Sequence, residues 1–309
     1  MPKKRRKNKA ISSFNRIKNY VRGSKDIRHG FSIARKNCPI SLYPDLIKWS
    51  ANQKHNISPL LGDPFPNKYH KILKLLPPNP LEWTQEIFWA AYRLRVHKQK
   101  LNEFILLSSE YEKEFTNSRF SASNEILKTI QNKFGLSFWL IENKIALLQI
   151  WKGLEAQKSY VEKVIEESNS GLVPYIAQYS SQRNEESVSI FRLIHRLEEI
   201  NSDHSVPNGM NNYISYKLFG TTPDSYDELG EILLYDGMSS LIDLYTSFFN
   251  ICSRLAILEE TNEQIEQMHR SLILVSEINN PYLVKTNILN SGDISSYSRL
   301  KKRNLTADM

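Results

Sequence analysis

The chain has 309 residues, of which 40% are hydrophobic and 24% are charged, an ordinary composition for a soluble globular protein. Its longest apolar run is the six residues Ile87–Tyr92, whereas a membrane-spanning helix needs about 20. Two cysteines, Cys38 and Cys252, are too few for a disulfide framework or a four-thiolate metal site, so we expect an intracellular, cytoplasmic protein without a transmembrane segment.

The net charge of +8 is concentrated at the two ends of the chain. Residues 1–36 contribute +12 and residues 285–309 contribute +3, which leaves −7 for residues 37–284. The sequence therefore predicts basic ends on an acidic folded body.

Residues 1–36 are predicted to form a basic arm, largely disordered with one short amphipathic helix. The stretch Pro2–Lys9 reads PKKRRKNK, and such a block of like charges repels itself. Behind it Ile11, Phe14, Ile17 and Val21 recur at helical spacing. The cations of the arm are candidates for contacts with nucleic acid, an acidic protein partner or an anionic membrane surface, and they are Lys3, Lys4, Arg5, Arg6, Lys7, Lys9, Arg16 and Lys18.

An alternative for the arm is a solubilising tail whose apolar side packs on the acidic body. The letters PKKRRK also resemble a nuclear localisation signal, which matters only in a cell with a nucleus. A basic block by itself does not separate these hypotheses.

Residues 37–80 are predicted to form an irregular, proline-rich strap. Six of the 13 prolines lie between Pro59 and Pro80, and each removes an amide donor and disfavours helix at the preceding residue. Apolar residues still favour short helices around 42–49 and 69–76. This apolar content predicts that the strap packs on the body, and any domain junction is expected here.

Residues 81–278 are predicted to form an all-α domain. From Trp83 an apolar stripe continues at helical spacing to about Thr116, as one long helix or as two with a kink near Lys98. No alternating strand of five or more residues follows Pro80. The fold predicted is an irregular multi-helix bundle or a short α-solenoid of helical hairpins, with a basic, partly disordered N-terminal arm.

Three glycines, Gly135, Gly153 and Gly171, are spaced 18 residues apart. Glycine just past a helix end is a favoured stop, because it adopts positive φ without a Cβ clash. The spacing predicts three consecutive helices over Ser121–Gly171, and two helices with their stops match the period of stacked helical hairpins. The second helix is apolar over more than half its circumference and is expected to be the most buried one.

The stretch Gly153–Val164, GLEAQKSYVEKV, resembles a tetratricopeptide hairpin, in which glycine before the second helix is followed by alanine and then an aromatic residue. The spacing from Gly153 to Tyr160 is about one residue short, and no neighbouring segment repeats the pattern. The resemblance covers about one hairpin and implies stacked helix pairs whose concave faces bind peptides or proteins. A helical bundle with glycine stops is the alternative.

Beyond Gly171 helices are predicted with less regular spacing. Asn184 is expected to cap a helix that carries Phe191, and a helical region follows Thr222 and ends at Gly237. An apolar helix from Leu241 comes next, and Thr261 with Gln264 forms a capping-box pair for the last helix. Residues 279–309 are a polar and basic tail.

No motif in the sequence indicates an enzyme or a cofactor. The phosphate-binding loop, the dinucleotide fingerprint and the nucleophile elbow are all missing. Glu266 and His269 have the spacing of a di-iron helix, but such a site uses the motif twice, and an exposed helical histidine is the simpler interpretation. Cys252 lies among apolar residues and is interpreted as a buried small hydrophobe.

The main basic patch inside the acidic body is predicted on the helix after Trp83. Arg93, His97 and Lys100 fall on one helix side, where they could receive nucleic acid or an acidic partner. The alternative is the solvated side of an amphipathic helix.

We therefore expect a non-enzymatic interaction or adaptor protein that uses a helical surface and the basic arm to engage a protein partner. The second hypothesis is a nucleic-acid-binding protein whose arm supplies phosphate contacts. The third is an all-α enzyme with dispersed catalytic residues.

Overall fold

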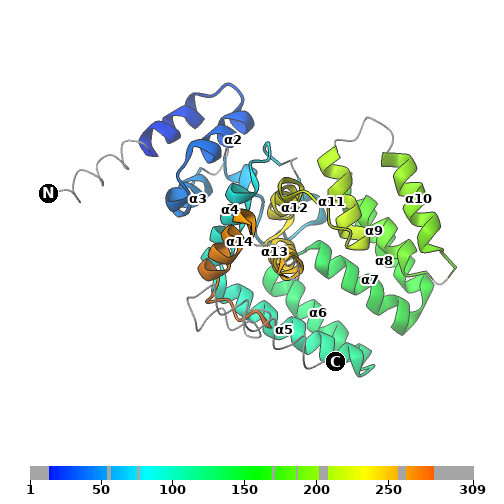
Figure 1. Ribbon diagram of the computed structural model, residues 1–309. Coiled ribbons are helices and arrows are strands. Elements are labelled where there is room, and N and C mark those ends of the chain that lie inside the picture. Colours follow the sequence, from blue (N-terminus) through cyan, green and yellow to red (C-terminus); the bar gives the residue numbers. More distant parts are fainter. Residues whose placement is uncertain are drawn as a thin grey trace, which may run out of the picture.

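The computed structural model describes residues 14–53, 57–74, 77–168, 171–185, 187–201, 208–256 and 262–281. Over these ranges the protein is all-α, as predicted, with no strand, and its helices pack as sequential hairpins (Figure 1). The predictions for the cationic block before residue 14 and for the tail after residue 281 lie outside the described residues.

The first helix is described over residues 14–23, and we refer to it as the N-terminal helix. The elements that follow are α2 (Ile27–Asn37), η1 (Ile40–Leu42), α3 (Tyr43–Ala51), η2 (Ser58–Leu61), η3 (Tyr69–Lys71), α4 (Trp83–Val96), α5 (Lys98–Thr116), α6 (Phe120–Phe134), α7 (Phe138–Lys152), α8 (Leu154–Ser168), α9 (Leu172–Arg183), α10 (Ile190–Asn201), α11 (Asn208–Phe219), α12 (Tyr226–Ser239), α13 (Leu241–Leu255) and α14 (Glu263–Leu274).

The helix α2 lies almost entirely within residues 1–36, which were predicted to be a largely disordered arm with one short helix. Asp26 caps it, because the Asp26 carboxylate accepts hydrogen bonds from the backbone N–H groups of Arg28 and His29 at 2.9 and 3.2 Å. Phe31 and Ala34 then face the core. The helix predicted near 42–49 is present as α3, whereas 69–76 holds only the short 3-10 helix η3 within its described residues.

The proline-rich strap packs on the helical body, in agreement with its apolar content. Leu61 and Ile72 are buried. Two strap carbonyls accept hydrogen bonds from amides at helix starts: Pro64 from Leu241 N at 2.9 Å, and Pro66 from Leu136 N at 2.6 Å. The strap therefore crosses the α6–α7 and α12–α13 turns and satisfies backbone donors there.

The helix after Trp83 is divided in two, which was one of the two predicted alternatives. His97 separates α4 from α5 and has φ −111°, ψ 19°, outside the helical region. The break near Lys98 is therefore confirmed.

The glycine spacing correctly predicted α6, α7 and α8. Gly135 and Gly153 follow α6 and α7 with φ of +72° and +85°, and Gly171 precedes α9 with φ +99°. Their ψ values lie between −156° and −178°, a region of positive φ that is essentially restricted to glycine.

Two helix caps differ from the prediction. Asn184 ends α9 instead of starting α10, which begins at Ile190. The cap of α14 is Asn262 and not Thr261: the Asn262 side chain accepts from Ile265 N at 2.9 Å. Gly237 also lies inside α12, which runs on to Ser239.

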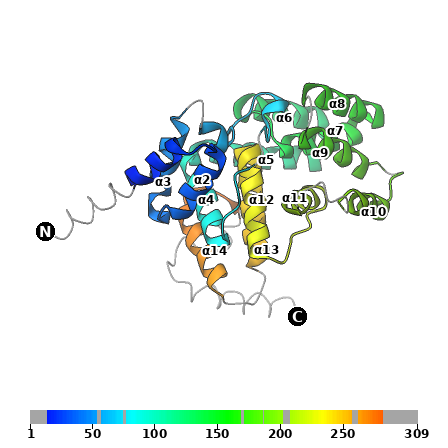
Figure 2. The ribbon, with the colours of Figure 1, turned by 90° about the horizontal axis from the view of Figure 1, so that it is seen from above.

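The centre of the molecule is the α12–α13 pair, and the expectation that α7 is the most buried helix is wrong. Buried residues make up 10 of the 14 in α12 and 11 of the 15 in α13, against 6 of the 15 in α7. In Figures 1 and 2 the pair lies between the helices α2–α4 and the hairpins α7–α9. α12, α13 and α14 all pack on α4, so the late helices close the fold against an early one.

This closure separates the fold from a simple solenoid, in which each repeat contacts only its neighbours. Successive helices from α5 to α9 do contact one another in order, but α7 also contacts α13, and α9 contacts α11. Within the ranges that the structure describes, no helix is long and apolar enough to cross a membrane.

Candidate functional site

Two candidate cations of the arm, Arg16 and Lys18, lie on the N-terminal helix. This helix is anchored on one side, because Ile17 and Val21 are 9% and 0% exposed. Arg16 and Arg22 are exposed and Lys18 is half-exposed. The docked apolar side leaves the cations available to a partner. The other arm candidates, Lys3, Lys4, Arg5, Arg6, Lys7 and Lys9, lie outside the described residues.

Aromatic rings accompany the cations of the N-terminal helix. The Lys18 ammonium lies 4.2 Å from the ring centroid of Phe14, and the Arg22 guanidinium lies 5.7 Å from that of Trp49 in α3. Both rings are half-buried, so each cation–π pair is formed at the surface. We call Phe14, Lys18, Arg22 and Trp49 the cationic–aromatic face.

Arg93, His97 and Lys100 do not form one exposed helical side. Arg93 is only 7% exposed, His97 is half-buried at the α4–α5 break, and Lys100 is exposed with its ammonium 4.4 Å from the ring centroid of Phe65. The predicted surface patch is thus wrong for Arg93, because α4 turns that side chain toward α12. Arg95 is exposed instead.

Arg93 belongs to a buried charge cluster with Arg35 and Glu86. Arg35 of α2 and Glu86 of α4 form an ion pair at 0% and 1% side-chain exposure. Glu86 also accepts a hydrogen bond from Leu81 N at 2.9 Å. Burial and the nearby Arg35 lower the pKa of Arg93 to about 10, a value at which the guanidinium is still charged at neutral pH.

Arg93 and His97 also line a pocket of about 590 Å³, which we call the α3–α4 pocket. It lies where α3, the strap from Ser58 to Pro64 and the C-terminal end of α4 meet. Burial, with Arg93 and Lys100 nearby, lowers the pKa of His97, so the imidazole is neutral at neutral pH.

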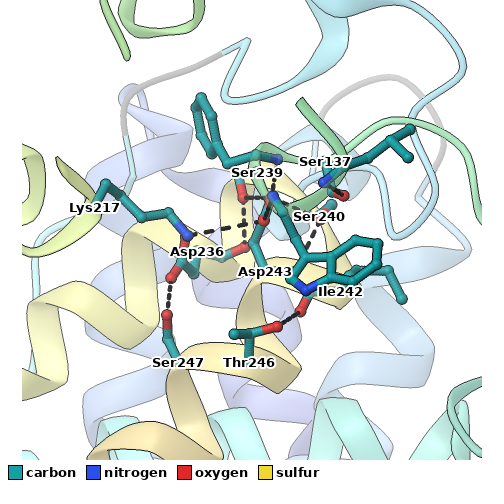
Figure 3. Close-up of polar contacts among 12 residues, drawn as sticks. Ser137, Lys217, Asp236, Ser239, Ser240, Ile242, Asp243, Thr246 and Ser247 are labelled. Atoms are coloured by element: carbon teal, nitrogen blue, oxygen red, sulfur yellow. Dashed lines mark hydrogen bonds and ion pairs between the residues drawn. The ribbon is translucent and has the colours of Figure 1, made fainter. Parts of the chain in front are cut away.

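A second buried polar cluster, which was not predicted from the sequence, joins α7, α11, α12 and α13 (Figure 3). Lys217 of α11 lies 3.0 Å from Asp236 Oδ1 and 3.8 Å from Asp243 Oδ1, and both carboxylates are fully buried. Asp236 also accepts hydrogen bonds from Tyr213 and Ser247. The sequence does contain a signal for this cluster. Asp236 and Asp243 are seven residues apart, and each interrupts an apolar helical stretch.

Asp243 performs three tasks in this cluster. It accepts hydrogen bonds from the backbone N–H groups of Phe138 and Trp139 at 3.0 and 2.9 Å, which caps α7 from a different helix. It also accepts from Ser239 and Ser240 at 2.8 Å, and it faces Lys217. The cluster is saturated by its own members, which favours a structural role over a catalytic one.

Replacing Glu142 with glutamine is expected to stabilise the protein increasingly as pH rises. Glu142 Oε1 is buried and has no hydrogen-bond partner in the described structure, and burial raises the pKa of the carboxyl from 4.5 to about 7. Between these two values the unfolded chain has lost a proton that the folded state keeps, so wild-type stability falls with rising pH. Glutamine does not titrate, so it removes this loss of stability, which is on the order of 1 to 3 kcal/mol.

Urea denaturation at about pH 5 and about pH 8 measures the difference between wild type and Glu142→Gln. The exposed Glu166 of α8 supplies the control, and Glu166→Gln should follow the wild-type curve at both values. Parallel pH profiles for wild type and Glu142→Gln would contradict a pKa of this carboxyl that burial raises despite the nearby Lys217 and Arg183.

Neither cysteine has the environment of a reactive thiol. Both are buried, and burial raises the pKa of Cys38 to about 12 and that of Cys252 further. The interpretation of Cys252 as a buried small hydrophobe is confirmed. In the described ranges no three His, Cys, Asp or Glu side chains are grouped to hold a metal ion. Glu266 pairs with Arg270, and His269 is buried, so the interpretation of an exposed histidine is wrong.

No protein family, curated protein or solved structure gives a significant match to the chain. The tetratricopeptide resemblance around Gly153 therefore has no support from a family match.

Proposed function

We propose that the protein is a non-enzymatic interaction module whose cationic–aromatic face, continued by the basic block before it, engages an acidic protein partner. The observation that carries the proposal is the docking of the N-terminal helix. Ile17 and Val21 anchor it in the core, while Arg16 and Arg22 are exposed. A cationic surface on a fixed helix binds an acidic segment at lower entropic cost than a free tail does.

The charge distribution favours a partner with a local acidic segment. Residues 37–284 carry −7, so a long polyanion that extended beyond the N-terminal region would meet repulsion. A short acidic segment avoids this repulsion. Half-buried Phe14 and Trp49 add apolar contact area beside the charges.

Nucleic acid is the second candidate, and one observation favours it. Single-stranded nucleic acids bind to surfaces where aromatic rings accompany Lys or Arg, because bases stack on the rings while the cations contact phosphates. Phe14 with Lys18 and Trp49 with Arg22 provide two such pairs. An anionic membrane surface is a third partner that the same charges would attract.

The test compares three forms of the full chain in affinity capture from native lysate, with and without nuclease. These are wild type, the double charge reversal Lys18→Glu with Arg22→Glu, and a control reversal at two exposed lysines, Lys113→Glu with Lys158→Glu. We expect proteins that survive nuclease treatment, are lost from the first double variant and are retained by the control.

Three results would overturn the protein-partner proposal. Complexes that disappear with nuclease, together with RNA or DNA affinity that falls steeply with salt, would favour nucleic acid. Binding only to vesicles with anionic lipid would favour a membrane surface. Equal capture by all three forms would exclude the cationic–aromatic face as the site.

A further inference from the structure

The α3–α4 pocket combines an apolar wall with one buried cation. Its volume of about 590 Å³ lies within the range of about 300–1,000 Å³ that is usual for small-molecule sites. The apolar part of the lining comes from Pro44, Ile47, Leu61, Pro64 and Val96. Val96 is 60% exposed, so the pocket opens to solvent beside it.

Arg93 has an unusual environment for a buried guanidinium. It is 93% buried, yet in the described part of the chain it makes no hydrogen bond and no ion pair. Glu86, the acid that raises the pKa of Arg93, is itself paired with Arg35 and Leu81 N. A charge that is largely removed from water without an ion-pair partner is costly, so a bound anion would stabilise this guanidinium.

The backbone around the pocket accommodates this guanidinium. A Cβ on Gly237 of α12 would lie 2.5 Å from Arg93 Nη1, so a larger residue there would displace the guanidinium from its present position. Gly62, at φ +72°, approaches the same turn of α12 so closely that its own Cβ would lie 2.7 Å from the Gly237 carbonyl oxygen. Gly237 thus leaves space beside α12 for the guanidinium of Arg93, and Gly62 lets the strap approach α12 at the pocket that Arg93 lines.

The charges around the pocket leave a single positive charge uncompensated. In the buried cluster two guanidinium groups face one carboxylate. At the pocket rim Asp45 and Lys48 offset each other, and His97 is neutral. A monoanion fits this balance, whereas a dianion such as a phosphate monoester would exceed it.

We propose that the α3–α4 pocket binds a monocarboxylate with an apolar body, whose carboxylate pairs with the Arg93 guanidinium. The planar fork of arginine matches a carboxylate in a bidentate hydrogen-bonded pair. The apolar body of the ligand lies against Ile47 and Leu61. Such a carboxylate comes from a free aliphatic acid or from the C-terminus of an apolar peptide. This site is separate from the cationic–aromatic face.

The experiment is calorimetric titration of the full chain with two matched pairs of probes. Decanoate is compared with decanol, and N-acetyl-Leu-Val as the free acid is compared with its C-terminal amide. We expect one acid to bind at a single site, with an affinity about 10- to 100-fold above that of its neutral twin. Which acid binds distinguishes the two sources of the carboxylate.

Variants connect the binding to Arg93. Arg93→Met should weaken binding of the acid about 10- to 100-fold and leave the melting temperature equal or higher, because an unpaired buried charge is removed. The control is Arg95→Met, two residues along α4 and exposed, which should bind as wild type does. Ala51→Trp fills the pocket from the end of α3 and should abolish binding with Arg93 intact.

The proposal is overturned if neither acid binds, if acid and neutral twin bind equally, or if Arg93→Met binds as wild type does. A strongly lowered melting temperature for Arg93→Met would assign Arg93 a structural role. In that case the Ala51→Trp variant decides whether the pocket is the binding site. Unchanged binding of the acid by this variant would exclude the pocket, and loss of binding would support it.

Discussion

Replacing Asp243 with alanine is expected to lower the free energy of unfolding by about 3–5 kcal/mol, the range for removing one partner of a buried ion pair. The carboxylate caps the N-terminus of α7 through Phe138 N and Trp139 N, and it compensates Lys217. Alanine leaves those amides and part of the ammonium charge without partners in a site that water does not reach.

Urea denaturation of wild type and Asp243→Ala measures this effect, with the exposed Asp224→Ala as control. Hydrogen exchange adds a local readout, since the amides of Phe138 and Trp139 should exchange faster in the variant. A loss below about 1 kcal/mol would mean that the cluster does not hold α7 to α13.

Replacing Gly135 with alanine is expected to lower the free energy of unfolding by about 3 kcal/mol or more. The reason is that a backbone penalty and a steric penalty add. Gly135 has φ +72° and ψ −156°, which an L side chain rarely adopts. A Cβ there would also lie 2.4 Å from the Pro66 carbonyl oxygen, which accepts the Leu136 amide. That atom belongs to backbone and cannot move aside as a flexible side chain does.

Gly153→Ala is the matched control for Gly135→Ala. Gly153 has φ +85°, and no atom lies within 4 Å of its Cβ position, so only the backbone penalty of about 1 kcal/mol applies. The difference between the two variants in urea denaturation measures the contact between the strap and the α6–α7 turn. An equal loss of unfolding free energy in the two variants would show that the strap does not constrain the α6–α7 turn.

Both predictions concern places where distant segments meet, and these were the hardest to predict from sequence. The apolar periodicity and glycine stops predicted α6, α7 and α8 well, since these signals act within a few residues. Asn184 was assigned to the wrong helix, because a polar residue between two helices can end one or begin the next.

Arg93 shows that the candidate sites, too, depend on contacts between distant segments that are hard to predict from sequence. Its spacing from His97 and Lys100 predicted a shared surface, but the helix breaks at His97 and the late helix α12 covers Arg93. Nothing in the local sequence indicates this covering, because Gly237 lies 144 residues further along the chain.

The sequence by itself determined the all-α class, the short-range helix stops and the basic character of the N-terminal region. These properties follow from local periodicity, from the conformational freedom of glycine and from composition. Only the tertiary structure decided that α12 and α13 form the centre, that Asp243 caps α7 and that Arg93 is buried at the lining of a pocket. Each of these depends on packing between segments far apart in the chain, where burial and charge pairing select among arrangements that local sequence leaves equivalent.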